Sequence, residues 1–492
     1  MSGVGTRVSA ILNARVAGPG REFLADEEPV DIHIARARIV DIAPAGALPV
    51  NGEVLDAEGA WVVPGLWDNH VHTVQWALAS ERERLSAAAS AVDAASRMSG
   101  VAPLADGRRV GTGFRDAFWD DAPSLDVLDR ATGEVPTYLI NADVHSVWLN
   151  SAALRREGFS SPDGMLREED AFEISKRVNA VEPEHSDRAV RVAAEAAAAR
   201  GVTGIVDFDM AWNADAWVRR AGAGPAMQRV EFAVYPADLE RAIAAGFRTG
   251  ETLPGTGGFV RIGALKIITD GSLGTRTAAC SHAYPGDAAD FGVLNIAPDE
   301  LIGLLTDAVG SGLGVAIHAI GDRAVSSALD AVTVTGASGT IEHAQLVRHA
   351  DLARLARLGL TASVQPQHAV DDRDLVEGYW AAQTAVGYPM ASLLRAGAQL
   401  RLGSDAPVAP LDPWRSIASA VLRTQDEREP WHPEERLSID EALLASVRSS
   451  VRPGDPADLV VCAADPRTAD GTTLGTMPVP ATLLGGRVTH QD

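Results

Sequence analysis

The sequence predicts an α/β fold: a (β/α)8 TIM barrel, a small β-sandwich domain formed by both chain ends, and a long insertion after strand 1. Three observations support this prediction. The middle of the chain alternates short β-branched runs with Ala-rich helical stretches, which is the pattern of a parallel sheet. The two ends carry only short β-type runs broken by Gly, Pro and Asp. One interval between predicted strands is far longer than a βα loop.

The two chain ends resemble each other in pattern. The N-terminal end contains the runs ILNARV, DIHIARARIVDI and EVLDAEGAWVV, and the C-terminal end contains DLVVCAAD and ATLLGGRV. Short strands separated by turn residues are typical of a small sandwich. We therefore assign residues 1–60 and 451–492 to one composite β-sandwich and residues 61–450 to the barrel.

Eight candidate strands lie in the middle of the chain, the number that a (β/α)8 barrel needs. They are Trp61–Asp68, Thr203–Phe208, Val230–Tyr235, Arg261–Thr269, Gly314–Ile317, Thr340–Glu342, Thr361–Gln365 and Gln399–Gly403. Before the second of these strands, the stretch DRAVRVAAEAAAARG predicts a helix, with Ser186 as its N-cap and a glycine at its end.

The interval between the first two predicted strands, roughly 130 residues, is too long for a βα loop. It contains a helical stretch, LASERERLSAAASAVDAASRM, and the segment YLINADVHSVWLNSAALRREG. We interpret residues 76–195 as an inserted lid region over the barrel mouth, because lids over catalytic sites exclude water and set substrate choice. Trp76 and Trp148 are expected to line an apolar pocket.

Composition excludes several classes of partner and location. The chain has 492 residues, with 43 Lys and Arg against 66 Asp and Glu, which gives a net charge of −23. Such a chain is a poor polyanion binder, so we expect no nucleic-acid partner and no anionic membrane partner. Two cysteines cannot form a disulfide framework, and we find neither a signal peptide nor an apolar run long enough to span a membrane. We therefore expect a cytoplasmic protein.

Side chains that can bind metal occur at or near the ends of five of the predicted strands. They are His70, His72, Lys266, His318, His343 and Asp405. In an extended segment residues i and i+2 point to the same side, so the imidazoles of His70 and His72 can face one ion. The C-terminal ends of barrel strands converge at the mouth, where we expect all six side chains to meet. A single His is more often structural, but the joint pattern favours a metal site.

These residues belong to longer segments that resemble the amidohydrolase superfamily. The segments are DAEGAWVVPGLWDNHVH, HSVWLNSAALRREG, LKIITDGSLGTRTA, VAIHAIGDRA, IEHAQLV, SVQPQH, LGSDAPV and PADLVV. PGLWDNHVH is typical of the superfamily. LKIITDGSLGTRTA together with HAIGDRA is more specific to amidohydrolase family 3, the branch of N-substituted formamide deformylase-like metal-dependent hydrolases. The resemblance covers nearly the whole chain.

The resemblance implies a site for two divalent metal ions. His70 and His72 would ligate one ion, His318 and His343 the second, and Asp405 would lie beside the first. Zinc is the expected metal, because imidazole suits Zn²⁺, with manganese, iron or nickel as alternatives. A site with one ion, built from the His pair, His318 and Asp405, remains open.

Lysine is rare in this chain, and Lys266 has a distinctive position. Of the 43 basic residues only Lys176 and Lys266 are Lys, which codon usage alone can explain. By the resemblance, Lys266 aligns with a lysine that is carboxylated by CO₂ and bridges two metal ions. A carbamate requires a neutral primary amine, which Arg cannot provide. The alternative is that Lys266 packs its stem in the barrel and pairs its charge with Asp270.

The resemblance also implies an activity, the hydrolysis of a C–N bond by metal-activated water. The expected substrate is a small molecule with an amide or N-formyl amide bond other than a peptide bond. Asp405 is expected to act as general base and then to pass the proton to the leaving nitrogen. His145, His368 and Arg276 are candidate substrate-binding residues, although each can equally serve a structural purpose.

Other readings of the same site stay open. A cyclic imide or hydantoin hydrolase, or a deaminase, would use the same strand-end residues with a different pocket. A non-catalytic relative that has lost its ligands is a further alternative, against which the presence of all six residues argues. The sequence does not show the oligomer, but barrels of this kind often pair, so a homodimer is our expectation.

Overall fold

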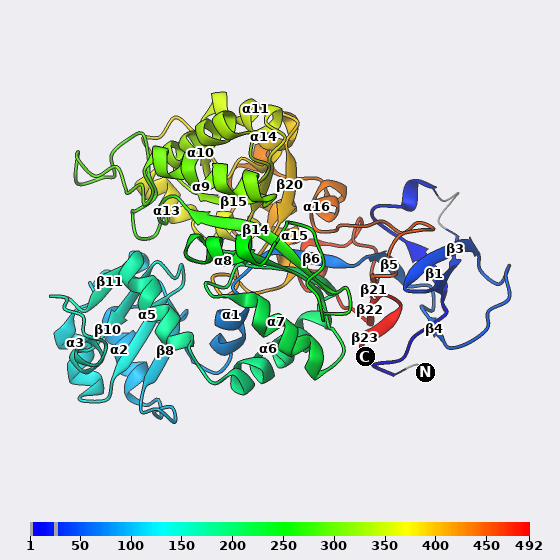
Figure 1. The fold of residues 1–492 in the computed structure, drawn as a ribbon, viewed down its shortest axis with the longest axis horizontal. Coiled ribbons are helices and arrows are strands. Elements are labelled where there is room, and N and C mark those ends of the chain that lie inside the picture. Colours follow the sequence, from blue (N-terminus) through cyan, green and yellow to red (C-terminus); the bar gives the residue numbers. More distant parts are fainter. Residues whose placement is uncertain (1–2, 24–27) are drawn as a thin grey trace.

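The structure is a computed structural model that describes residues 3–23 and 28–492. These residues form a barrel, a β-sandwich and an inserted α/β unit, and Figure 1 shows the sandwich and the insertion on opposite sides of the barrel. The predicted fold class is therefore confirmed. No helix among the described residues combines the length and the apolar character that a membrane crossing needs.

The barrel consists of eight parallel strands in the order β20-β18-β16-β15-β14-β13-β12-β6. Their bounds are β6 Leu66–Val71, β12 Val202–Asp207, β13 Arg229–Val234, β14 Val260–Ile268, β15 Val315–Ala319, β16 Gly339–His343, β18 Thr361–Val364 and β20 Gln399–Leu402. The first and last strands meet at the mouth, where the Asp405 N–H donates to the His70 carbonyl at 2.8 Å. The His72 N–H donates to the Ala406 carbonyl at 2.9 Å, so this closure joins two expected metal-binding segments.

Seven of the eight predicted strands agree with the structure to within two residues at each end, but the first is divided. Trp61–Pro64 forms β5, which belongs to the sandwich, and the barrel strand β6 starts at Leu66. Gly65 lies between them, and a Cβ atom there would be 2.1 Å from Thr203 Oγ1. The chain therefore changes sheets at a residue where no side chain fits, and the sandwich extends past the predicted boundary at residue 60.

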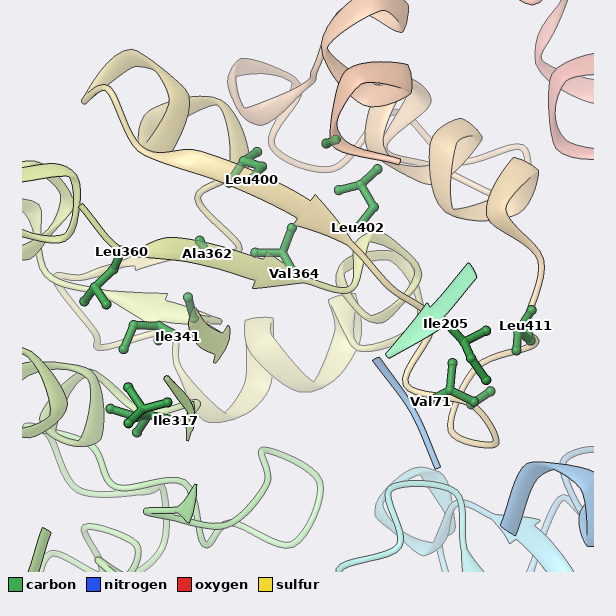
Figure 2. Packing of buried hydrophobic residues seen from close by; sticks show 14 of the residues in the cluster. Val71, Ile205, Ile317, Ile341, Leu360, Ala362, Val364, Leu400, Leu402 and Leu411 are labelled. Carbon is green, nitrogen blue, oxygen red and sulfur yellow. The ribbon is translucent and has the colours of Figure 1, made fainter. Parts of the chain in front are cut away.

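The apolar side chains of the barrel strands pack outward against the surrounding helices. Figure 2 shows part of this layer, in which Ile317, Ile341 and Leu402 lie fully buried or nearly so. Burial of each such side chain stabilises the fold by about 1.5–3 kcal/mol. The principal helices around the barrel are α1 Thr73–Ala79, α6 Pro183–Ala198, α7 Asn213–Ala223, α8 Leu239–Ala244, α9 Pro298–Ser311, α10 Asp322–Thr335, α11 His349–Arg357, α14 Met390–Arg395, α15 Pro413–Leu422 and α16 Ile439–Ala445.

The helix that we predicted to start after Ser186 starts earlier. Helix α6 begins at Pro183, and Glu182 is its N-cap. Proline suits the first helical position, because it lacks an N–H that would otherwise need a partner. Ser186 therefore lies inside the helix, where its Oγ accepts a hydrogen bond from Arg220 at 3.0 Å.

The sandwich combines both ends of the chain, as predicted. Its main strand order is β23-β22-β21-β5-β1-β2-β3, with β4 beside β1. The bounds are β1 Ala10–Val16, β2 Val30–Ala35, β3 Arg38–Pro44, β4 Val54–Asp56, β21 Leu459–Cys462, β22 Ala481–Leu484 and β23 Arg487–Gln491. N-terminal Ile11 and Ile32 share a buried core with C-terminal Leu459 and Leu483. In Figure 1 the blue and red strands lie together for this reason.

The insertion contains a sheet that the sequence pattern did not predict. Its strands, in the order β11-β10-β9-β8-β7, are β7 Glu83–Arg84, β8 Arg109–Phe114, β9 Thr137–Asn141, β10 Ser146–Leu149 and β11 Met165–Arg167. Its helices are α2 Ala91–Ser99, α3 Leu125–Thr132, α4 Ser151–Glu157 and α5 Glu169–Asn179. Every residue of β9 and β10 is buried, so neither strand shows the alternation that marks a half-exposed strand.

Candidate metal centre

The ends of the barrel strands bring all six predicted metal-binding residues to one cavity. The residues are His70, His72, Lys266, His318, His343 and Asp405. His70 belongs to β6 and His72 is the N-cap of α1, whereas Asp405 follows β20. The cavity has a volume of about 80 Å³, enough for several water molecules.

Potential ligand atoms converge without forming ordinary hydrogen bonds. Asp405 Oδ1 lies 3.3 Å from His72 Nε2 and 3.6 Å from His70 Nε2. One ligand atom each from His70, His343 and Asp405 lies within 4.8 Å of the other two. Among the described residues, neither Asp405 Oδ1 nor His318 Nε2 has a hydrogen-bond partner, although both atoms are buried and Asp270 Oδ1 lies 3.5 Å from His318 Nε2. Buried polar atoms without partners are costly, so this donor set fits a bound cation.

The backbone at two of these residues is held in an uncommon conformation. His343 has φ 71° and Asp405 has φ 59°, both in the left-handed region. Residues other than glycine pay a conformational cost there, and such residues cluster at functional sites. At the end of β16 this conformation breaks the strand alternation. The side chains of the neighbours Glu342 and His343 therefore both lie at the mouth, where Glu342 contacts His70 and His343 lines the cavity.

Glu342 is a site residue that the sequence reasoning missed. Its Oε2 lies 2.7 Å from His70 Nδ1, and both side chains are almost fully buried. In the same way Gln365 Oε1 lies 2.9 Å from His343 Nδ1. Each contact engages Nδ1 and leaves Nε2 of the same ring for the centre. The signal in the sequence was an acidic residue next to a predicted ligand, at the end of an apolar strand.

Lys266 lies within β14, completely enclosed by the site. It is 1 % exposed, and its Nζ lies 3.3 Å from His70 Nε2 and 4.2 Å from the centre of the Phe208 ring. Burial lowers the pKa of Lys266 to about 8, although Glu342 and Asp405 oppose this shift. The alternative partner, Asp270, accepts backbone N–H groups from Ala279, Ile320 and Gly321 instead.

The geometry of the first strand end depends on a second buried carboxylate, that of Asp68. It accepts the backbone N–H groups of His70 at 3.2 Å and of Ser404 at 2.8 Å. Burial raises the pKa of Asp68 to about 7. Asp68 therefore holds the backbones of two neighbouring strand ends together.

Of the three predicted substrate-binding residues, two line the cavity. His145 comes from the insertion, and its ring centre is 5.5 Å from that of His318. Burial lowers the pKa of His145, but Glu168, 3.0 Å away, more than compensates and raises it to about 9. His368 stacks on His343 with ring centres 6.5 Å apart. Arg276 is not among the lining residues, and its guanidinium lies 5.8 Å from the centre of the Tyr379 ring.

The insertion lines one wall of the cavity, as a lid would, but with different aromatic residues from those expected. Phe118 and Phe172 contribute to the lining, together with Val144. Trp148 is instead completely buried in the core of the insertion, and Trp76 lines another cavity. The expectation was wrong for Trp148, because a strand of the unpredicted sheet points it into the core of the insertion, whereas Trp76 lines an apolar pocket outside the metal centre.

Comparison with known proteins gives consistent similarities. The sequence profile described as the amidohydrolase family matches residues 53–490. The chain is 30 % identical to Protein LONG AFTER FAR-RED 3 of Arabidopsis thaliana, over 83 % of this chain and 78 % of that protein. It is 25 % identical to N-substituted formamide deformylase of Arthrobacter pascens, over 91 % of each.

A solved structure has the same fold. It is the crystal structure of a metal-dependent hydrolase from Pyrococcus horikoshii OT3, with a TM-score of 0.78 and 24 % sequence identity. The likeness covers 94 % of this chain and 99 % of that one. The barrel, the sandwich and the insertion are thus all within the shared region.

Proposed function

This chain belongs to the amidohydrolase family, and we propose that it hydrolyses an amide or N-formyl amide bond of a small molecule. The family is one of metal-dependent hydrolases that act on C–N bonds. The observation that carries the proposal is the convergence of Asp405 Oδ1 with His70 Nε2 and His72 Nε2, at 3.6 and 3.3 Å, in a buried cavity.

The proposed ligands are the four strand-end histidines and Asp405, with Lys266 between them. Imidazole nitrogens with one carboxylate suit Zn²⁺, the ion that we propose, at two positions. Lys266 Nζ lies 3.3 Å from His70 Nε2 and has no carboxylate partner of its own in the described residues. We propose a carbamate on Lys266 because the residue aligns, by the family resemblance, with a bridging lysine, and its enclosed position beside His70 would suit that role.

Divalent metal in this site would lower the pKa of a bound water molecule and polarise a substrate carbonyl. Asp405 would accept the proton of the attacking water and deliver it to the leaving nitrogen, because its buried Oδ1 lies within 3.3–3.6 Å of the His72 and His70 rings at the proposed metal position. Glu342 keeps the His70 ring oriented through Nδ1. The insertion lines one wall of the cavity, where a lid would limit the access of water.

The substrate would lie between the histidines and the insertion. Phe118, Phe172 and Leu273 offer apolar surface there, and His145 and His368 offer polar contacts. An amide with an apolar N-substituent fits this lining. The named activity of the Arthrobacter relative, removal of formyl groups from N-substituted formamides, supports the same class.

The test is hydrolysis by the full chain loaded with Zn²⁺ or Mn²⁺. The panel contains N-formyl amines, N-acyl amino acids, hydantoins and aminopyrimidines, and release of amine, acid or ammonia is measured. We expect turnover of the acyclic amides. Turnover of hydantoins alone or of aminopyrimidines alone would replace the proposal with a cyclic amide hydrolase or a deaminase.

A further inference from the structure

A second cavity lies between the barrel floor and the β-sandwich, away from the candidate metal centre. Its volume is about 360 Å³. Its walls come from the N-terminal ends of β13 and β14, the hairpin between β2 and β3, and the segments around residues 448 and 458. We call it the floor cavity.

The residues that line the floor cavity carry an excess of positive charge, whereas the chain as a whole is acidic. Two carboxylates, Glu231 and Asp458, face five guanidinium groups. The five belong to Arg36, Arg38, Arg229, Arg261 and Arg448. The chain as a whole has a net charge of −23, so an excess of positive charge in one hollow is a local feature. Clefts lined by one sign of charge concentrate counter-ions.

Each of the two carboxylates already has its own arginine. Asp458 accepts two hydrogen bonds from Arg229, at 2.6 and 3.1 Å. Glu231 accepts one from Arg448 at 2.5 Å, and Arg448 also donates to Asn69 Oδ1 at 2.7 Å. The acidic groups of the cavity therefore do not neutralise the other three arginines.

None of these three has an ion-pair partner among the described residues, and two of them make no hydrogen bond either. Arg38 donates to the Gly454 carbonyl at 2.6 Å. Among the described residues, the guanidinium groups of Arg36 and Arg261 have no hydrogen bond or ion pair, and both side chains are exposed. Arg36 lies in the tight turn between β2 and β3 with φ 50°, so the sandwich presents it to the barrel.

We propose that the floor cavity binds a small phosphate-bearing anion. Guanidinium groups bind phosphate oxygens through two parallel N–H donors, which makes arginine well suited to this ligand. The cavity is larger than a single phosphate needs, so a pyrophosphate or a phosphomonoester fits. Trp67 and Ala37 supply apolar wall beside the arginines. The site is separate from the metal centre and does not depend on the proposed hydrolysis.

Binding to the full chain is measured by titration calorimetry with inorganic phosphate, pyrophosphate and glucose 6-phosphate. We expect saturable binding of at least one of the three. The tightest ligand distinguishes an inorganic source from a phosphorylated organic molecule. No saturable binding of any of them would overturn the proposal.

The double variant Arg36→Ser/Arg261→Ser tests the location. We expect binding at least about tenfold weaker, because charge-assisted hydrogen bonds are lost. The matched control is Arg188→Ser/Arg357→Ser, which removes the same charge from two exposed arginines outside the cavity. An equal change in both double variants would overturn the proposal, because it would show a general charge effect or binding elsewhere. Melting temperatures without ligand confirm that both variants fold.

Discussion

The two ends of the barrel carry cavities of opposite chemistry. At the mouth, four imidazoles, Asp405 and Lys266 are buried, and the closest of them lie 3.3 Å apart. At the floor, five guanidinium groups surround a larger cavity that opens to solvent. Imidazoles, carboxylates and a neutral amine can bind a metal ion or a proton, whereas guanidinium keeps its charge. The mouth can therefore hold metal and exchange protons, and the arginines of the floor supply permanent positive charge.

The lysines illustrate the same difference. Lys176 is exposed on α5 of the insertion, but Lys266 is enclosed at the mouth. A chain that uses arginine for nearly all of its positive charge keeps a lysine where a neutral amine is useful. The basic residues that line the floor cavity, where permanent charge is enough, are all arginines.

Replacement of Asp405 would remove the proposed general base, and we expect it to have the largest effect on turnover. We expect Asp405→Asn to lower kcat by about 10³-fold or more, because general base catalysis is lost. Metal content, measured by elemental analysis, should remain near that of the wild type. Normal turnover in this variant would show that Asp405 is not the general base.

The substitution Lys266→Arg tests whether the mouth needs an amine. We expect loss of the second metal ion and of most activity, because arginine cannot form a carbamate. Metal content per chain is the measurement, and Lys176→Arg is the matched control. If Lys266→Arg keeps its full metal content and activity, the lysine has no special function.

The substitution Glu342→Gln alters the support of a ligand and not the ligand itself. Metal affinity should fall about 10–100-fold, because Glu342 orients the His70 ring through Nδ1. A competition titration with a chelator gives the affinity. Glu435→Gln serves as control, since Glu435 is equally buried but bonds to Ser392, away from the mouth. Equal affinities in the two variants would contradict the assignment.

A rise to alkaline pH should weaken the His145–Glu168 ion pair at the mouth, and we expect this to be the smallest of the four effects. The pKa of His145 is about 9 in the folded chain, above its ordinary value of 6.5. Its ion pair with Glu168 therefore stabilises the fold fully below about pH 6.5, and this stabilisation is lost as pH rises through about 9. Melting temperatures of metal-free wild type and His145→Gln should converge across this range. A constant difference would argue against the ion pair.

Most of the fold and the six mouth residues could be predicted because they follow simple rules. Strand ends of a barrel converge, so residues such as His318 and Asp405 could be placed together without a structure. Glu342 was missed because the positive φ of His343 interrupts the strand alternation, which a sequence pattern does not show. The sheet of the insertion was missed because β9 and β10 are buried on both faces. The floor arginines lie far apart in sequence and carry no motif.

The sandwich has a consequence for how the protein is made. Strand β5 pairs with β1 on one side and with β21 on the other. During synthesis β5 leaves the ribosome about 400 residues before β21. The edge of β5 that pairs with β21 therefore stays unpaired until the whole barrel has been synthesised. Unpaired strand edges invite pairing with other chains. The last strands of the protein thus also protect its first ones, and a chain truncated before β21 would leave that edge open.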